Sequence, residues 1–167
     1  MKRTLTIGLL VVTLVLVSSA SMALAAPKTL TFAQSGGITS LETAGMQPRD
    51  YPAGYEAAFA IYNGLIRFTE NLEFEPDLAT EWHVAEDGVT WTFTLKEGVK
   101  FHDGTPFNAD AVVSAYNRMI DPSINLAAYT LWEPVAEIRA TGEYEVQIIT
   151  HKPYGGLLNV LAHGCAL

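Results

Sequence analysis

Residues 98–119 read GVKFHDGTPFNADAVVSAYNRM and contain a histidine next to an aspartate, His102-Asp103. A histidine beside a carboxylate is the kind of pair that general acid-base catalysis uses. Side chains of sequence neighbours rarely point at one another, however, and no nucleophile motif accompanies this pair. Asp103-Gly104 followed by Thr105-Pro106 is typical of a chain reversal. The pattern therefore favours a turn over a catalytic site.

Metal ligation and phosphate binding are the other chemistries to consider. His163-Gly164-Cys165 offers two soft ligands, but zinc and nickel sites require more, and the other histidines lie in separate predicted strands and turns. Gly36-Gly37 lacks the G-x-x-x-x-G-K pattern of a phosphate loop, and neither G-x-S-x-G nor H-E-x-x-H is present. We therefore predict no metal site, no cofactor and no catalytic residue, and a secreted hydrolase is kept only as an alternative.

A helix is predicted directly after the His102-Asp103 turn. Asn108 stands where an N-cap belongs, because its side chain can accept a hydrogen bond from a free N–H of the first turn. Asp110 and Arg118 place charges that favour the helix dipole at its two ends. Apolar residues recur at helical spacing on one face, at Val112, Tyr116 and Met119. We expect a helix from Ala109 to Met119 that stops at Asp121-Pro122.

Antiparallel strands are predicted on both sides of this helix. Residues 82–101, WHVAEDGVTWTFTLKEGVKF, carry turn signals at Asp87-Gly88 and Glu97-Gly98, which predicts a meander whose last strand ends at Phe101. A second hairpin is predicted from Val135 to Thr150. It turns at Thr141-Gly142-Glu143 and places Tyr144, Val146 and Ile148 on one face.

The region before residue 69 predicts a strand, a loop, a helix and a second strand. Thr29 to Ala33 alternates like a strand, and Gln34 to Asp50 is polar and contains glycine, as loops do. Tyr55, Phe59 and Tyr62 share a helical face, and Gly64 is expected to end that helix in the left-handed conformation. A strand then begins at Leu65 and runs to Phe68.

The first 25 residues are predicted to be a cleaved signal peptide. They combine a basic start at Lys2-Arg3, an apolar centre from Leu5 to Val17 and the cleavage pattern Ala23-Leu24-Ala25. The only cysteine is Cys165, so a lipoprotein is not expected. Two of the ten basic side chains lie in the signal, and its removal changes the formal charge from −8 to −10. Nucleic acid is therefore an unfavourable partner.

Two stretches carry a resemblance to a known family. YNGLIRF at 62–68 and PDLATEWHVAEDGVTWTFTLKEGVKFHDGTPFNADAVVSAYNRMIDP at 76–122 resemble the signature of family 5 extracellular solute-binding proteins. Residues 135–162 are similar to the family's next hairpin and helix. The order and spacing of these pieces over about 130 residues make the resemblance specific. Members are the dipeptide, oligopeptide and nickel receptors of ABC importers.

The resemblance implies a mixed α+β, periplasmic binding protein-like fold with two lobes. Residues 26–61 would start domain I with a strand, a cleft loop and a helix. Residues 62–167 would form most of domain II, with antiparallel hairpins and a few helices, and would end before the return to domain I. The main ligand anchors would then lie beyond Leu167.

The resemblance also implies a function. A periplasmic receptor would capture peptides by hinge closure and deliver them to the permease subunits of an ABC transporter, and a chemoreceptor is a possible further partner. A nickel chelate or a haem-like ligand is the alternative solute. The candidate ligand contacts are Gln47, in the loop Ala44 to Pro48, and the aromatic residues Tyr129 and Trp132. These two aromatics could equally be core or surface residues.

Overall fold

The computed structural model describes Thr31 and residues 58–163. The predicted signal peptide, most of the first strand and the loop with Gln47 lie outside this part of the chain. A helical turn at residues 58–61 opens it. The remaining elements are β1 Ile66–Phe68, β2 Phe74–Pro76, β3 Ala79–Val84, β4 Thr90–Leu95, α3 Ala109–Ile120, α4 Tyr129–Trp132, β5 Val135–Gly142, β6 Glu145–Thr150 and α5 Leu157–Ala162. The mixed α+β class is confirmed.

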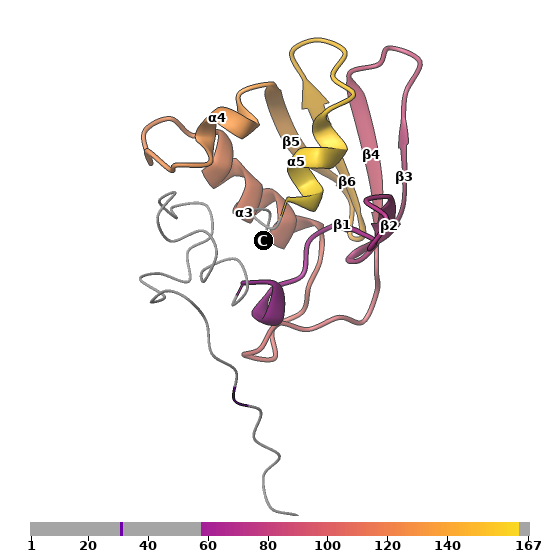
Figure 1. The fold of residues 1–167 in the computed structure, drawn as a ribbon, viewed down its shortest axis with the longest axis vertical. Helices are drawn as coiled ribbons and strands as arrows, with labels where there is room; N and C mark the ends of the chain where they lie inside the picture. Colours follow the sequence, from indigo (N-terminus) through magenta and orange to yellow (C-terminus); the bar gives the residue numbers. More distant parts are fainter. Residues whose placement is uncertain (1–30, 32–57, 164–167) are drawn as a thin grey trace, which may run out of the picture. The chain divides into compact units, whose positions relative to one another are not determined.

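The strands form two antiparallel sheets. β1 pairs with β2, and the larger sheet has the order β3-β4-β6-β5. Helix α3 packs against β5 and β6, whereas α5 packs against β1, and Figure 1 shows the helices gathered on one side of the larger sheet. The apolar side chains between these layers form one core. Its largest fully buried members are Trp132, Tyr116, Phe93, Phe107, Leu65, Ile66, Ile148, Leu157, Leu161, Val112 and Val146.

Strand β4 lies between β3 and β6. The segment that ends at Phe101 therefore does not add a third strand beside β4, and the predicted meander is wrong. After Gly98 the chain leaves the sheet, and only an isolated bridge joins Lys100 to Pro106. Strand β6 pairs with β4 from Thr90 to Thr94 and places Val146 and Ile148 opposite Phe93 and Trp91. All four of these apolar side chains are buried. Burial of this distant strand favours β6 over a short local strand.

The two predicted hairpins are confirmed. At the turn between β3 and β4, Gly88 has a φ of 67°, and the Asp87 carboxylate accepts hydrogen bonds from the N–H groups of Val89 and Thr90 at 2.8 and 2.9 Å. Strands β5 and β6 pair from Val135 to Thr150. Because Gly142 pairs with Glu145, the turn consists of residues 143–144 rather than Thr141-Gly142-Glu143. Tyr144, predicted to share a strand face with Val146 and Ile148, therefore lies in the turn before β6.

Helix α3 is capped as predicted. The Asn108 Oδ1 atom accepts a hydrogen bond from the Ala111 N–H at 3.0 Å, and the Asn108 backbone is extended. Asp110 lies in the first turn and Arg118 in the last. The helix continues to Ile120, one residue further than expected, and its buried face contains Ala109, Val112, Tyr116 and Met119. A local capping interaction therefore starts the helix that covers β5.

Replacing Asn108 with alanine is expected to lower the free energy of unfolding by about 0.5 to 2 kcal/mol, because the Ala111 N–H loses its acceptor. Urea denaturation of the wild type and the variant measures this difference. Asn108→Ser is the matched control and should recover most of the loss, since a serine hydroxyl can accept the same bond. Equal stabilities of Asn108→Ala and the wild type would contradict the capping role.

The sequence did not predict strand β2 or the tip that joins it to β1. The Thr69 Oγ1 atom accepts hydrogen bonds from the N–H groups of Asn71 and Glu73 at 3.2 and 3.1 Å. Within this tip Leu72 has a φ of 62° and an exposed fraction of 77%. A leucine in the left-handed region is uncommon and strained. Its side chain gains little burial that would offset the strain.

Replacing Leu72 with glycine is expected to raise the free energy of unfolding by about 0.5 to 1 kcal/mol, because glycine adopts a positive φ without steric cost. Leu72→Ala keeps the Cβ atom and the strain, so it should differ little from the wild type. Thermal and urea denaturation of the three proteins test this. A glycine variant less stable than the alanine variant would show that the Leu72 conformation is not strained.

Candidate functional site

The segment between the helical turn and β1 is fastened by Asp77, which follows β2. The Asp77 carboxylate accepts two hydrogen bonds from the Asn63 amide at 3.0 and 3.1 Å and one from the Gly64 N–H at 3.2 Å. The Leu65 carbonyl accepts from the N–H groups of Asp77 and Ala79 at 3.2 and 2.8 Å. These bonds fix residues 63–65 against the link between the two sheets.

Gly64 is not the left-handed helix cap that the sequence predicted. Glycines with a positive φ in the described part of the chain are Gly88, Gly98 and Gly104, and the helical turn ends at residue 61. A Cβ atom on Gly64 would lie 3.0 Å from the Ile66 carbonyl oxygen and 3.3 Å from that of Leu161. A side chain here would therefore crowd two backbone carbonyls, one in the same segment and one at the end of α5.

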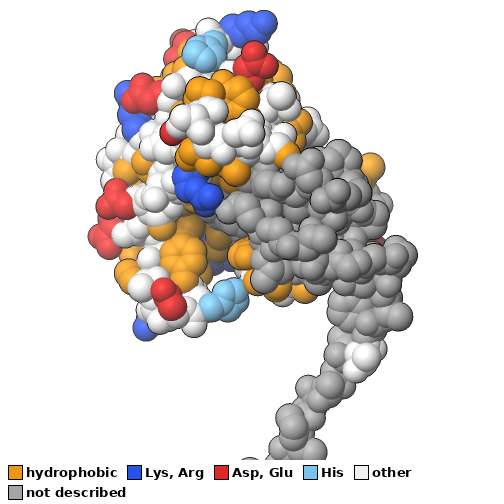
Figure 2. Space-filling view, turned by 90° about the vertical axis from the view of Figure 1, so that its left-hand side faces the viewer, with side chains coloured by type: hydrophobic (Ala, Val, Ile, Leu, Met, Phe, Trp, Pro, Cys, Tyr) orange, Lys and Arg blue, Asp and Glu red, His pale blue; other side chains and the backbone are white. Residues whose placement is uncertain are grey.

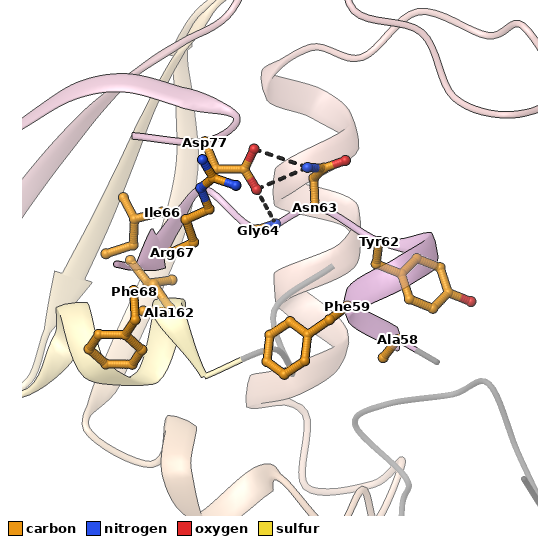
Figure 3. A pocket seen from close by; sticks show the side chains of 11 residues that line it. Ala58, Phe59, Tyr62, Asn63, Gly64, Ile66, Arg67, Phe68, Asp77 and Ala162 are labelled. Carbon is orange, nitrogen blue, oxygen red and sulfur yellow. Dashed lines mark hydrogen bonds between the residues drawn. The ribbon is translucent and has the colours of Figure 1, made fainter. Parts of the chain in front are cut away.

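A pocket of about 330 Å³ lies beside this segment. Residues from the helical turn, β1 and α5 line it together with Asp77. Figure 3 shows the Asn63, Asp77 and Arg67 side chains on one side of the chain, and the rings of Phe59 and Phe68 on the other. The lining residues are Ala58, Phe59, Tyr62, Asn63, Gly64, Ile66, Arg67, Phe68, Asp77, Leu161 and Ala162.

The polar side of the pocket carries one cationic and one anionic side chain, those of Arg67 and Asp77. Arg67 pairs with Glu75 across β1 and β2, with 2.8 Å between Nε and Oε1. Asp77 adds a second carboxylate, which neutral donors satisfy. Because the Arg67–Glu75 pair is exposed to water, it does not remove the cationic character of Arg67. This side therefore offers both a guanidinium and a carboxylate to a polar solute.

The apolar side of the pocket contains aromatic rings. Phe68 contacts Phe74 on the neighbouring strand, with ring centroids 5.2 Å apart. Phe59 has an exposed fraction of 64%, although it is apolar. An apolar surface next to a few placed polar groups is the usual composition of a small-molecule site. The pocket could thus hold an apolar group by burial and an attached donor by hydrogen bonding.

The predicted ligand contacts lie elsewhere. Gln47 is outside the described residues. Trp132 is fully buried at the end of α4, where its ring contacts Tyr116 with centroids 4.7 Å apart. Tyr129 begins α4 and is half-buried. Trp132 therefore lies in the core, which was the alternative interpretation of this residue. Ligand contact by Gln47, Tyr129 or Trp132 stays a prediction.

The His102-Asp103 pair lies in a turn, as predicted. Gly104 has a φ of 88°, and Asp103 Oδ1 accepts hydrogen bonds from the Thr105 hydroxyl at 2.6 Å and the Thr105 N–H at 2.9 Å. These bonds lower the pKa of Asp103, so its carboxylate is ionised near neutral pH. His102 is exposed beside it. The aspartate holds the turn.

His102→Ala is therefore expected to leave solute affinity unchanged within about twofold, because the imidazole is exposed and the Asp103–Thr105 hydrogen bonds hold the turn. Calorimetric titration of the variant with any solute that the wild type binds measures the effect. Thr105→Val serves as a comparison, since it removes the hydroxyl donor to Asp103 and should weaken the turn. A tenfold loss of affinity in His102→Ala at normal thermal stability would contradict the turn interpretation.

Metal ligands do not gather in the described part of the chain. No three His, Cys, Asp or Glu side chains among those residues lie close enough to hold an ion. Helices in the same part are all too short or too polar to cross a membrane. On the face shown in Figure 2, lysine and arginine side chains are scattered among acidic ones and form no basic patch.

The fold is that of periplasmic binding proteins of ABC transporters, as two solved structures show. NikZ from Campylobacter jejuni, solved in complex with Ni(L-His), superposes with a TM-score of 0.67 at 28% identity, over 76% of this chain and 25% of NikZ. DppA from Helicobacter pylori, a periplasmic binding protein associated with an ABC transporter and solved with the peptide STSA, gives 0.62 at 26% identity, over 74% and 27%.

Residues 73–166 match the bacterial extracellular solute-binding proteins, family 5, and the chain belongs to this family. The glutathione-binding protein GsiB of Escherichia coli K12 is 37% identical over 106 residues, which are 64% of this chain and 21% of GsiB. The chain thus spans about a fifth to a quarter of these relatives. The family consists of binding proteins of ABC transporters, not enzymes, so the secreted hydrolase has no support.

Sequence reasoning did not find the pocket. Its walls come from residues 58–68, from Asp77 and from residues 161–162, and no spacing in the sequence connects these stretches. Residues 63–68 were predicted as a helix end and a strand and as part of the resemblance, not as part of a ligand site. A signal was present in Asn63-Gly64 followed by Asp77, but only the fold shows that this carboxylate accepts from both residues.

Proposed function

We propose that this chain is part of a receptor that captures peptides and delivers them to the permease of an ABC importer. The observation that carries the proposal is the family 5 match over residues 73–166, together with 37% identity to a protein named for binding glutathione, itself a peptide. DppA, solved with a peptide, supports the same solute class. A chemoreceptor partner finds no support among these relatives.

Solute capture in such a receptor requires no bond breakage. Contacts made by both lobes favour the closed state, and the population of closed molecules rises with solute concentration. Within this scheme we propose that residues 26–61 start domain I and that residues 62–167 belong to domain II. Gln47, Tyr129 and Trp132 remain the proposed contacts from the sequence, and the pocket at residues 58–68 adds a further candidate.

A metal chelate is the second candidate solute. NikZ, solved with Ni(L-His), covers as much of this chain as the peptide-binding relative does. A chelate would bring its own metal ligands, so the lack of a protein metal cluster in the described residues does not separate the two solutes. The pocket also allows a peptide or a metal chelate, since both kinds of solute carry hydrogen-bond donors and apolar groups.

Calorimetric titration of the protein produced from its own gene separates the solutes. The panel contains glutathione, dipeptides, oligopeptides and Ni(L-His), each at the same pH and ionic strength. We expect saturable peptide binding without any change in the peptide, checked by mass spectrometry. Binding of Ni(L-His) alone would replace the peptide proposal with the chelate. Hydrolysis of a peptide would overturn the receptor assignment.

The proposed location is the periplasm, since exported members of this family act outside the inner membrane and the first 25 residues have the signal pattern. Cell fractionation with N-terminal sequencing tests this. We expect a periplasmic protein that starts at Ala26. A membrane-bound protein that retains Met1 to Ala25 would contradict both the location and the cleavage site.

A further inference from the structure

We propose that Asn63-Gly64 is a deamidation site and that the Asp77 carboxylate suppresses the reaction while the chain is folded. The inference concerns a covalent modification, so it does not depend on which solute the receptor binds. It comes from the dipeptide itself, from the crowding that keeps glycine at position 64, and from the hydrogen bonds that Asp77 accepts from both residues.

Asn63 is the one asparagine in the sequence that precedes a glycine. An asparagine deamidates when the backbone nitrogen of the next residue attacks its side-chain carbonyl carbon, and a glycine has no Cβ atom to hinder that approach. Every other asparagine is followed by a residue with a side chain. These pairs are Asn71-Leu72, Asn108-Ala109, Asn117-Arg118, Asn125-Leu126 and Asn159-Val160. Local chemistry therefore makes Asn63 the most reactive asparagine of the chain.

The reaction needs only water and hydroxide, which reach Asn63 because its side chain is exposed. The Gly64 nitrogen gives its proton to hydroxide and forms a bond to Asn63 Cγ. The bond from Cγ to Nδ2 then breaks, and ammonia leaves after Nδ2 takes a proton from water. Water opens the succinimide ring at either carbonyl, which gives aspartate or isoaspartate at position 63. Nothing is oxidised or reduced.

Asp77 contacts both of the groups that react. Its Oδ2 atom accepts a hydrogen bond from the Gly64 N–H at 3.2 Å, and its two oxygens accept from Asn63 Nδ2 at 3.0 and 3.1 Å, as Figure 3 shows. An anion that forms on the Gly64 nitrogen would lie beside the carboxylate, and like charges repel. A carboxylate is also too weak a base to take an amide proton itself. The contact therefore slows the first step.

Ring closure also requires this segment to open. The Asn63 side chain must leave Asp77, and the backbone must turn until the Gly64 nitrogen faces Asn63 Cγ. The backbone is held against such a turn, because the Gly64 carbonyl accepts a hydrogen bond from the Leu78 N–H at 3.0 Å. The folded chain is thus expected to react through a local opening that breaks these bonds.

The fold nevertheless keeps the reactive pair in place. A Cβ atom on Gly64 would lie 3.0 Å from the Ile66 carbonyl oxygen and 3.3 Å from that of Leu161, so a residue that would slow the reaction crowds the backbone. Asn63 supplies the donors that fasten the segment to Asp77. Deamidation would replace these donors with a second carboxylate facing Asp77, so the modified segment loses its fastening.

The test is a time course of deamidation in the protein produced from its own gene, kept in mildly alkaline buffer and followed by peptide mapping with mass spectrometry. We expect Asn63 to react at least about tenfold more slowly in the folded protein than in urea. Asn71, which precedes a leucine, is the slow internal reference. Equal rates at Asn63 with and without urea, or a rate in urea no faster than that of Asn71, would overturn the proposal.

Asp77→Asn tests the carboxylate, because it keeps the shape of the side chain and removes its charge. Asn108→Ala is the matched control, since it weakens the cap of α3 and leaves the bonds to Asp77 in place. The wild type and both variants are compared at urea concentrations that give equal free energies of unfolding. Asp77→Asn should react at Asn63 at least about tenfold faster than the wild type, and Asn108→Ala should match the wild type within about twofold.

Equal rates in the three proteins would show that global unfolding controls the reaction. A slower reaction in Asp77→Asn would show that the carboxylate promotes it. Either result overturns the role of Asp77.

A stability comparison decides the matter even if Asp77→Asn alone does not fold. Asn63→Asp reproduces one product of the reaction and should be less stable than the wild type, because it places two carboxylates together. Adding Asp77→Asn restores an amide opposite a carboxylate, so the double variant should be more stable than Asn63→Asp. Urea denaturation measures both. A double variant that is no more stable than Asn63→Asp would show that positions 63 and 77 are not coupled, and the proposal would fail.

Discussion

Replacing Trp132 with alanine is expected to lower the free energy of unfolding by about 3 to 5 kcal/mol, the usual cost of removing a large buried aromatic side chain. Trp132 is fully buried, and its ring contacts Tyr116, which is also fully buried. The alanine would leave a cavity between α3 and α4. Urea denaturation followed by far-UV circular dichroism measures the loss without depending on tryptophan fluorescence.

Two further variants make this test specific. Trp132→Phe should cost clearly less than alanine, because most of the ring volume remains and the indole N–H has no hydrogen-bond partner to lose. Leu131→Ala, at an exposed position of the same helix, should change stability by less than about 0.5 kcal/mol. A loss below about 1 kcal/mol in Trp132→Ala would show that the residue is not part of the core and would favour its proposed contact with solute.

Replacing Gly64 with alanine is expected to lower the free energy of unfolding by about 1 to 3 kcal/mol through overpacking. The new methyl group would meet the carbonyl oxygens of Ile66 and Leu161 at 3.0 and 3.3 Å. Both are backbone atoms, so β1 or α5 must shift to make room. The shift should also change the pocket, because both elements supply its walls.

Gly155→Ala is the matched control for this substitution. Nothing lies within 4 Å of its Cβ position, and its φ is not in the left-handed region. That variant should be neutral or more stable by up to about 1 kcal/mol, because alanine reduces the entropy of the unfolded chain. Calorimetric melting of both variants decides the matter. A Gly64→Ala protein as stable as Gly155→Ala would show that the carbonyls of Ile66 and Leu161 do not crowd this position.

Local chemistry in the sequence determined the turns, one helix and the family. Asp87-Gly88, Asp103-Gly104 and the Asn108 cap were predicted because each depends on hydrogen bonds between residues at most three positions apart. The buried face of α3 followed from helical spacing alone. Such features need no knowledge of what packs against them, because the interacting groups are joined by a short piece of chain.

The neighbours of these elements were decided only by the tertiary structure. Strand β4 pairs with β6, more than 50 residues away, because that pairing buries two apolar rows that a local third strand could not bury. Of the two carbonyls that crowd Gly64, that of Ile66 is local and that of Leu161 is brought there by the fold. Trp132 is buried because α4 folds onto Tyr116. Long-range packing also creates the pocket, because its walls come from stretches that lie far apart in the sequence. The sequence pattern within each stretch does not show that the stretches come into contact.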